Sequence, residues 1–428
     1  MERIRQLRAR QRCIAWIMLA AALGVGCALR IAHLGGVEHY SPDENFYTYF
    51  AAQIADHGPG AMRPEFAKYN GDSVLWNYPS PTRIGHLPFV VAAMEIGGVR
   101  DQSAGVAASF IFSCMSLFLL AWIGVRFFNP WVAIAAVAFL GSSVGELGMS
   151  RRAWQDSPFG FFGLLGVYLT CAIISNPRRI WPYPAFLAAG VMSLLTKQTG
   201  VISYGVCAIW LLGYLIFGLQ WWREAILLAL GGIASIAVTL GVWSMLAGSM
   251  SVALLAATHS IHPTSLGLDY LEYCCTGPWY HFFYLLWIVG PLPAVLALFG
   301  AAVSLFPRRL LPRVGGTGAL AEPSCAPIAA WMTIGFFAYA ALYPGMQCLR
   351  YISPADGTFA LLAALGLWYL LALARRAMSR TDHRLLVVLA VLGVVIAGAR
   401  DYRIFTSVVV GSGMPDLSVT DILKVMNR

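Results

Sequence analysis

Two adjacent carboxylates open a predicted helix in the first long polar segment of the chain. Ser41-Pro42-Asp43-Glu44 has the order of a capping box, with Ser at the N-cap, Pro at the first helical position and Glu at the third. The pattern predicts a helix from Pro42 to about Asp56. A carboxylate at a helix N-terminus stays ionised, so Asp43 or Glu44 could act as a general base on a hydroxyl group. The alternative is that both only complement the helix dipole.

Basic side chains occupy three other short polar segments, and together they could hold a phosphate group. They are Arg151 and Arg152 in the segment before Asp156, Lys197 between two apolar runs, and Arg350 just before a helix start. A cation at a helix start is disfavoured by the helix dipole unless an anion shares the site. An ionisable group at membrane level is a functional candidate by default.

Simpler interpretations of these basic residues remain open. Arg152 could pair with Asp156 across one helical turn and anchor the segment at the interface. Lys197 could extend its ammonium group to the lipid headgroups. We expect no metal site: the spacing of His259 and His262 could suit a metal, but no third partner lies at a defining spacing. A divalent metal cofactor stays open, as does a disulfide among Cys274, Cys275 and Cys348.

The composition places these residues in a membrane protein. The chain has 428 residues, of which 59% are hydrophobic and 11% are charged, and its mean hydropathy is +0.69. A soluble protein carries roughly 25% charged residues. The net charge of +9 does not indicate nucleic-acid binding, because the charges form short clusters between apolar runs, as the positive-inside rule predicts.

The apolar runs predict an all-α polytopic protein with about eleven transmembrane helices. Five arginines precede the first run, so we place the N-terminus in the cytoplasm and interpret the run as an uncleaved span. The apolar stretch 84–98 is short, and laying it flat at the interface keeps later basic clusters cytoplasmic. The predicted spans are 13–33, 104–126, 130–147, 157–175, 181–195, 199–217, 224–247, 283–305, 328–343, 358–374 and 384–399.

This topology predicts one membrane-embedded domain at an inner (plasma) membrane, from residue 1 to 399. The domain includes a first extracytoplasmic loop, 34–103, with interfacial helices. A short extracytoplasmic tail, 400–428, follows the domain. The outward-facing loops then hold nearly all the residues that do not resemble plain membrane anchors.

The order of these motifs resembles the GT-C superfamily of glycosyltransferases, in particular the protein O-mannosyltransferases and the aminoarabinose transferase of lipid A. Asp43-Glu44 with Tyr47 resembles the opening motif of that superfamily, and the resemblance covers most of residues 13–375. The chain has only a small tail where several relatives carry a soluble domain. The other matching segments are Arg83 to Gly98, Ser150-Arg151 to Asp156, Gly190 to Lys197, Pro278-Trp279-Tyr280, and Arg350-Tyr351 with Pro354.

The resemblance implies a polyprenyl-phosphate-linked sugar donor and an acceptor that is a lipid, a glycan or a protein. Lys197, Arg350, Arg151 or Arg152 would then bind the donor phosphate, and Tyr351 would help to line the carrier site. Asp43 would take the acceptor proton, and attack from the opposite face of C1 would invert the anomeric carbon. Glu44 and Asp156 would orient or support the reacting groups.

Two other functions compete with this interpretation. A lipid-linked oligosaccharide ligase or polymerase would also use prenyl-linked donors on the outer face. A transporter or flippase without chemistry would show repeated halves and ionisable groups near the membrane midplane. We see no internal repeat, and the unusual charges cluster in the predicted outer loops.

Overall fold

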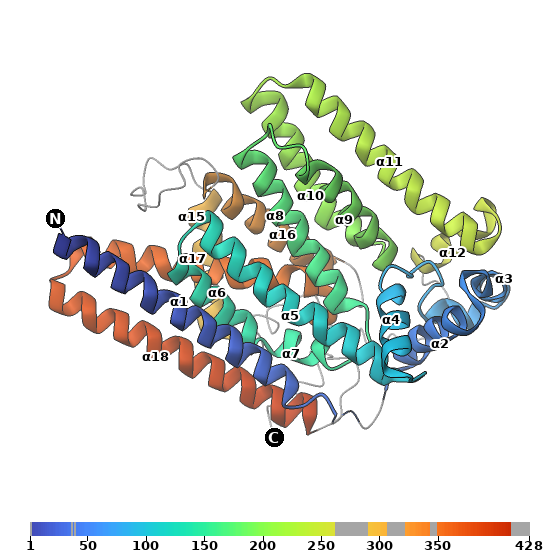
Figure 1. The fold of residues 1–428 in the computed structure, drawn as a ribbon, viewed down its shortest axis with the longest axis horizontal. Helices are drawn as coiled ribbons and strands as arrows, with labels where there is room; N and C mark the ends of the chain where they lie inside the picture. Colours follow the sequence, from blue (N-terminus) through green and yellow to red (C-terminus); the bar gives the residue numbers. More distant parts are fainter. Residues whose placement is uncertain are drawn as a thin grey trace.

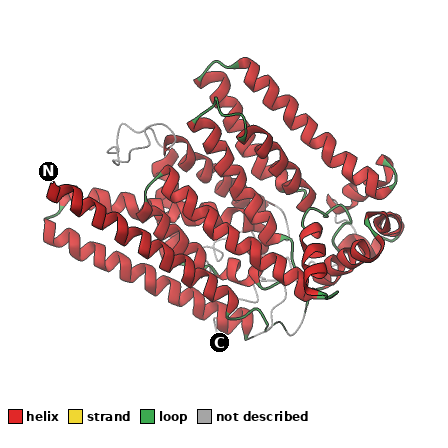
Figure 2. Cartoon of the chain, in the orientation of Figure 1, coloured by secondary structure: helices red, strands yellow, loops and turns green. Residues whose placement is uncertain are grey.

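The computed structural model describes residues 2–35, 37, 40–261, 290–305, 322–342 and 349–411, and these form a bundle of helices without strands (Figures 1 and 2). Within these described ranges, seven helices are long and apolar enough to cross a membrane. They are α1 (Glu2–Ile31), α5 (Gln102–Phe127), α8 (Asp156–Ser175), α10 (Gly200–Gly213) with η3 (Tyr214–Gly218), α11 (Trp222–Ala247), α17 (Ser353–Ala377) and α18 (Arg380–Ile404) with η7 (Phe405–Val410).

Four further helices coincide with the remaining apolar runs or follow them, and their apolar stretches within the described residues are 10–17 residues long. They are α9 (Pro182–Thr196), α12 (Met250–Ile261), α15 (Pro291–Leu305) and α16 (Glu322–Leu342). The all-α, multi-pass membrane architecture is therefore as predicted. The count of eleven spans stays a prediction, because 283–289, among other residues, lies outside the described part of the chain.

One predicted span, 130–147, is broken in the structure. It consists of α6 (Pro130–Ser142) and α7 (Val144–Ser150), which meet at Ser143 at an angle of 63°. Gly and Ser neighbours favour such a kink. The guanidinium of Arg30 on α1 donates to the carbonyl oxygens of Leu140 and Gly141, at 3.4 and 3.3 Å, where the helix stops. A buried arginine thus supplies donors to a helix end inside the membrane domain.

The first predicted outer loop folds into short helices that pack on the ends of the spans. They are α2 (Pro42–His57), η1 (Pro59–Ala61), α3 (Met62–Gly71), η2 (Ser73–Asn77) and α4 (Leu87–Gly97). With 11 residues, α4 is about 16 Å long, so it cannot cross a bilayer core of about 30 Å. This agrees with the prediction that 84–98 does not span. Buried Phe50, Phe66 and Leu87 join Trp243 of α11 in one apolar cluster.

The C-terminal ends of α1 and α18 meet, as Figure 1 shows. His33 Nε2 lies 3.0 Å from the Tyr402 hydroxyl, and the His33 ring packs on Phe405. The start of α1 and the end of α18 therefore lie at opposite ends of the bundle. The helix α18 also continues past the predicted boundary at residue 399, because the stretch up to Val410 stays helical, and 412–428 lie outside the described residues.

Candidate active site

Glu44 fastens the start of α2 to the segment that joins α7 to α8. Its fully buried carboxylate accepts hydrogen bonds from the backbone N–H of Ser41 at 2.7 Å and of Ala153 at 2.8 Å, and it pairs with Arg152. Burial raises the pKa of Glu44, and the pairing with Arg152 opposes that shift. The alternative pairing of Arg152 with Asp156 is wrong, since Arg152 is bound to a carboxylate more than a hundred residues earlier.

Asp43, the neighbour of Glu44, faces a basic residue from the far end of the sequence. Its Oδ2 lies 2.8 Å from Nη1 of Arg350, and its side chain is 14% exposed. Arg350 lies in the short helix η6 (Leu349–Ile352), directly before α17. The ring of Trp154 contacts the guanidinium groups of both Arg152 and Arg350, at 5.0 and 5.1 Å from its centroid. The Trp154 ring is therefore a contact that the two arginines share.

Lys197 and Asp156 form a second buried ion pair. The Lys197 Nζ lies 2.9 Å from Oδ1 of Asp156, and the two side chains are 6% and 3% exposed. Burial lowers the pKa of Lys197, the Asp156 carboxylate raises it, and nearby Arg350 and Arg83 lower it further. The alternative that Lys197 extends to the headgroups is thus wrong: its ammonium group points into the protein toward a carboxylate.

Arg83 is a site residue that the sequence interpretation missed, because it was treated only as the flank of an apolar stretch. Its Nε donates to Gln198 Oε1 at 3.2 Å, and Gln198 donates to Thr82 at 2.6 Å. Gly85 N–H donates to the Leu195 carbonyl at 2.9 Å, so the two segments are held together. Arg83 is thereby placed beside Lys197, and it joins Lys197 and Arg350 as a third basic side chain of the candidate site.

Tyr47 lies among these charges, one helical turn after Asp43. Its buried hydroxyl is hydrogen-bonded to Arg83, and the charges of Asp43 and Asp156 both act on it. Burial raises the pKa of Tyr47, so the phenol stays protonated. His86 packs edge-on against the Tyr47 ring at 4.6 Å, and burial lowers the pKa of His86 to about 3. Asp43 and Tyr47 share one helix face, and this spacing could have indicated from the sequence that Tyr47 lies in the candidate site.

Arg151, another predicted phosphate-binding residue, makes different contacts from Lys197 and Arg350. The guanidinium of Arg151 is buried, lies 6.0 Å from the Phe405 ring, and has its Nε and Nη1 without a partner among the residues described. The Arg151 pKa is lowered by burial and by the neighbouring Arg152 charge. Tyr351 is part of η6, and its side chain lies outside the described residues.

The histidine pair considered for a metal lies only partly within the described residues. The His259 ring stacks on Trp76 at 3.7 Å, which gives it a packing role, and His262 is not described. Within the described ranges, no group of three His, Cys, Asp or Glu side chains could hold a metal ion. Cys274, Cys275, Cys348 and the segment around Pro278 also lie outside those ranges.

The bundle, with its short helices over one end, has the fold of two solved structures, ArnT and an archaeal oligosaccharyltransferase. It is similar to ArnT from Cupriavidus metallidurans in the apo state, with a TM-score of 0.56 and 15% identity over 97% of this chain and 76% of ArnT. The same protein bound to undecaprenyl phosphate aligns with a TM-score of 0.52 and 16% identity, over 96% of this chain and 75% of ArnT.

A second similar structure is the apo oligosaccharyltransferase from Archaeoglobus fulgidus. The TM-score is 0.60 and the identity 12%, over 94% of this chain and 56% of that one, so this chain spans little more than half of it. No family model matches the sequence, and no curated protein matches it. The predicted GT-C architecture is therefore confirmed at the level of the fold.

Trp154 offers a test of how the two arginines are positioned. In the Trp154→Phe variant the hydrogen bond from Trp154 Nε1 to Ser41 Oγ, 3.0 Å long, is lost together with ring area. We expect the free energy of unfolding to fall by about 1–3 kcal/mol. Turnover should also fall, because Arg152 and Arg350 lose the indole ring that both contact. The matched control is Trp76→Phe, which loses a 2.8 Å indole hydrogen bond to the Tyr69 carbonyl and contacts no guanidinium among the described residues. Equal effects of both variants on turnover would contradict the role of Trp154.

Proposed function

We propose that the protein is a glycosyltransferase that moves a sugar from a polyprenyl-phosphate carrier to an acceptor on the extracytoplasmic face of the membrane. The observation that carries the proposal is the convergence of acidic and basic side chains from distant segments at one end of the bundle. Asp43 reaches Arg350, and Asp156 reaches Lys197, across sequence separations of 307 and 41 residues. The similarity to ArnT, which was solved with undecaprenyl phosphate, supports a carrier of this chemistry.

The basic residues would stabilise the leaving group. When the bond from C1 to the phosphate oxygen breaks, negative charge returns to the polyprenyl phosphate, and fixed cations in a water-poor site stabilise that charge. Lys197, Arg350 and Arg83 provide the cations, and we retain Arg151, Arg152 and Tyr351 as further donor-binding residues by resemblance. The carrier cannot leave the bilayer, so it would enter the site sideways from the lipid.

Asp43 would act as the general base. Its carboxylate is bound to Arg350, and a donor phosphate would compete for that guanidinium and release Asp43 toward the acceptor. The acceptor oxygen then forms its bond to C1 while its proton passes to Asp43, and the configuration at C1 is inverted. The Glu44 carboxylate is already bound to Ser41, Ala153 and Arg152, so Glu44 would hold the segments of the site in position. Asp156 would likewise hold Lys197 in position.

The side of the membrane on which we place the candidate site follows from the charge pattern of the sequence. With the N-terminus in the cytoplasm and the end of α18 outside, the candidate site lies on the extracytoplasmic side, where nucleotide sugars are absent and a lipid-linked donor is needed. The contact between His33 and Tyr402 agrees with this arrangement, since it puts the ends of α1 and α18 on the same side.

An oligosaccharide ligase is the second candidate. The similarity to the Archaeoglobus fulgidus oligosaccharyltransferase, which has the higher TM-score of the structures compared, favours it. The two functions differ in the donor, because the first takes a single sugar on a monophosphate carrier and the second takes a longer glycan on a diphosphate carrier.

A donor assay with the full chain in proteoliposomes separates these functions. Radiolabelled monosaccharide on undecaprenyl monophosphate is offered in one reaction, and labelled oligosaccharide on undecaprenyl diphosphate in the other, each with a bacterial membrane extract as acceptor. We expect label to move to the extract only from the monophosphate, with release of undecaprenyl phosphate. Transfer only from the diphosphate would favour the ligase. Movement of unmodified donor across the membrane, without transfer, would overturn both.

A further inference from the structure

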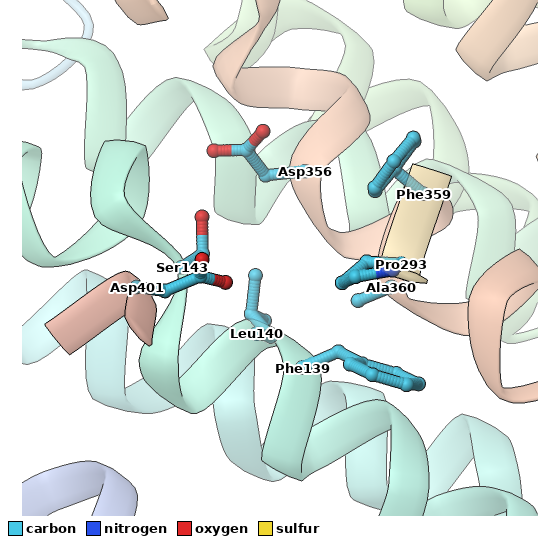
Figure 3. Close-up of a pocket in the computed structure, with 8 residues that line it drawn as sticks. All are labelled: Phe139, Leu140, Ser143, Pro293, Asp356, Phe359, Ala360 and Asp401. Carbon is cyan, nitrogen blue, oxygen red and sulfur yellow. The ribbon is translucent and has the colours of Figure 1, made fainter. Parts of the chain in front are cut away.

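A small polar space lies inside the membrane domain, between α6, α15, α17 and α18. Its volume of about 20 Å³ gives room for one water-sized particle, since about 10–15 Å³ is enough to hold a water. In Figure 3 the oxygen-bearing side chains of Asp356, Ser143 and Asp401 lie on one side, and the rings of Phe139 and Phe359 lie on the other. Only a single ion or a water can therefore occupy this space.

Asp356 brings a buried carboxylate to this space. The residue is 9% exposed, and its Oδ2 has no hydrogen-bond partner in the part of the chain that the structure describes. It lies in the first turn of α17, which is one of the candidate spans. An isolated carboxylate is strongly disfavoured away from water, so buried carboxylates are normally paired or bind a metal ion. An ionisable group inside a membrane domain therefore indicates a functional site.

The charges around the space do not cancel within the described residues. Asp401 is paired with Arg400 at 2.9 Å. Glu146, whose charge acts on Asp356, lies 4.0 Å from Arg30. Three carboxylates thus face two guanidinium groups, which leaves one negative charge without a counterpart among these residues. A single positive charge in the volume of one water would restore neutrality.

We propose that this space binds a monovalent alkali cation, sodium or potassium, held by the carboxylates of Asp356 and Asp401 and by the Ser143 hydroxyl oxygen. Hard cations take oxygen ligands, and all three side chains supply them. A water would give Asp356 a hydrogen-bond donor without the missing charge, whereas an alkali cation supplies that charge. Divalent ions fit less well, because Mg²⁺ keeps several waters and Ca²⁺ takes about six to eight oxygen ligands.

The cation would connect three helices that are far apart in the sequence. Ser143 is the residue at which α6 and α7 meet, at an angle of 63°. Asp356 lies at the start of α17, six residues after Arg350, and Asp401 lies near the end of α18. Binding would therefore stabilise the packing of these helices around the break. It does not depend on the proposed sugar transfer.

The test measures the thermal midpoint of the purified full chain in phosphatidylcholine nanodiscs. Sodium chloride and potassium chloride each replace choline chloride at constant ionic strength, and choline serves as the inert cation because it is too large for the space. We expect the midpoint to rise with the concentration of the alkali cation and then to level off, as binding to the folded state requires. A rise with one salt identifies the ion, and a rise with both shows that the site takes either.

Asp356→Asn separates this site from other effects of salt. The variant should need at least tenfold more cation for the same rise. In choline chloride its midpoint should equal or exceed that of the wild type, because the carboxylate without a counterpart is gone. A lower midpoint in every salt would instead show that Asp356 serves only the packing. The matched control is Asp382→Asn, an exposed carboxylate at the start of α18, which should respond like the wild type.

Asp401→Asn is the second variant should Asp356→Asn fail to fold, and the same tenfold weakening is expected of it. The proposal is overturned if the wild-type midpoint is equal in all three salts, which would leave the space to a water or the charge to a proton on Asp356. It is also overturned if either folded variant keeps the wild-type response to sodium and potassium.

Discussion

Replacing Asp43 with Asn should abolish sugar transfer while the protein still folds and inserts. General acid–base catalysis contributes about 10²–10⁴ in rate, and an amide cannot take the acceptor proton. Asn keeps an oxygen that can accept from Arg350, so the 2.8 Å contact has a neutral replacement and the local packing is preserved. The measurement is single-turnover transfer from the labelled monophosphate donor, together with the thermal midpoint of the detergent-solubilised protein.

The matched control for this variant is Glu95→Gln. Glu95 is an exposed carboxylate of the same loop, paired with Arg100, and losing such a surface pair costs at most about 1 kcal/mol. Its turnover should stay at the wild-type level. Full turnover of Asp43→Asn would remove Asp43 from the role of base. If donor binding falls but bound donor still reacts at the normal rate, Asp43 instead holds Arg350 in place.

The local structure of the chain was predictable from its sequence because it depends on neighbouring residues. The order Ser41-Pro42-Asp43-Glu44 predicted a helix from Pro42, and α2 runs from Pro42 to His57. Apolar runs of sufficient length located the spans, since a bilayer accepts only segments that satisfy their own backbone hydrogen bonds. The shortness of 84–98 likewise separated α4 from the spans.

The pairing of charges in the candidate site was not predictable in the same way. Arg152 pairs with Glu44 and not with Asp156, and Lys197 is buried against Asp156 and does not reach the headgroups. Which partner a long side chain finds depends on how helices far apart in sequence pack, and several partners are compatible with the same local pattern. The break at Ser143 is a similar case, because the groups that stabilise it come from α1.

The buried pair of Lys197 and Asp156 should respond strongly to the loss of one partner. In Lys197→Met the buried Asp156 carboxylate loses the ammonium group 2.9 Å away, which should destabilise the protein by about 3–5 kcal/mol. Transfer should fall about 10²–10³-fold, because one of the cations facing the leaving phosphate is gone. Both effects are measured in one preparation, as the thermal midpoint and as single-turnover rate.

A double variant distinguishes the two roles of this pair. Replacing both members of a buried ion pair by uncharged groups often changes stability little. Lys197→Met combined with Asp156→Asn should therefore recover most of the fall in thermal midpoint seen with Lys197→Met alone. Transfer should not recover, since the neutral pair supplies no charge to the phosphate. A double variant that regains turnover along with stability would show that the pair only holds α8 against the end of α9. The donor phosphate would then have to be stabilised by Arg350 and Arg83, which enter the site from independent segments.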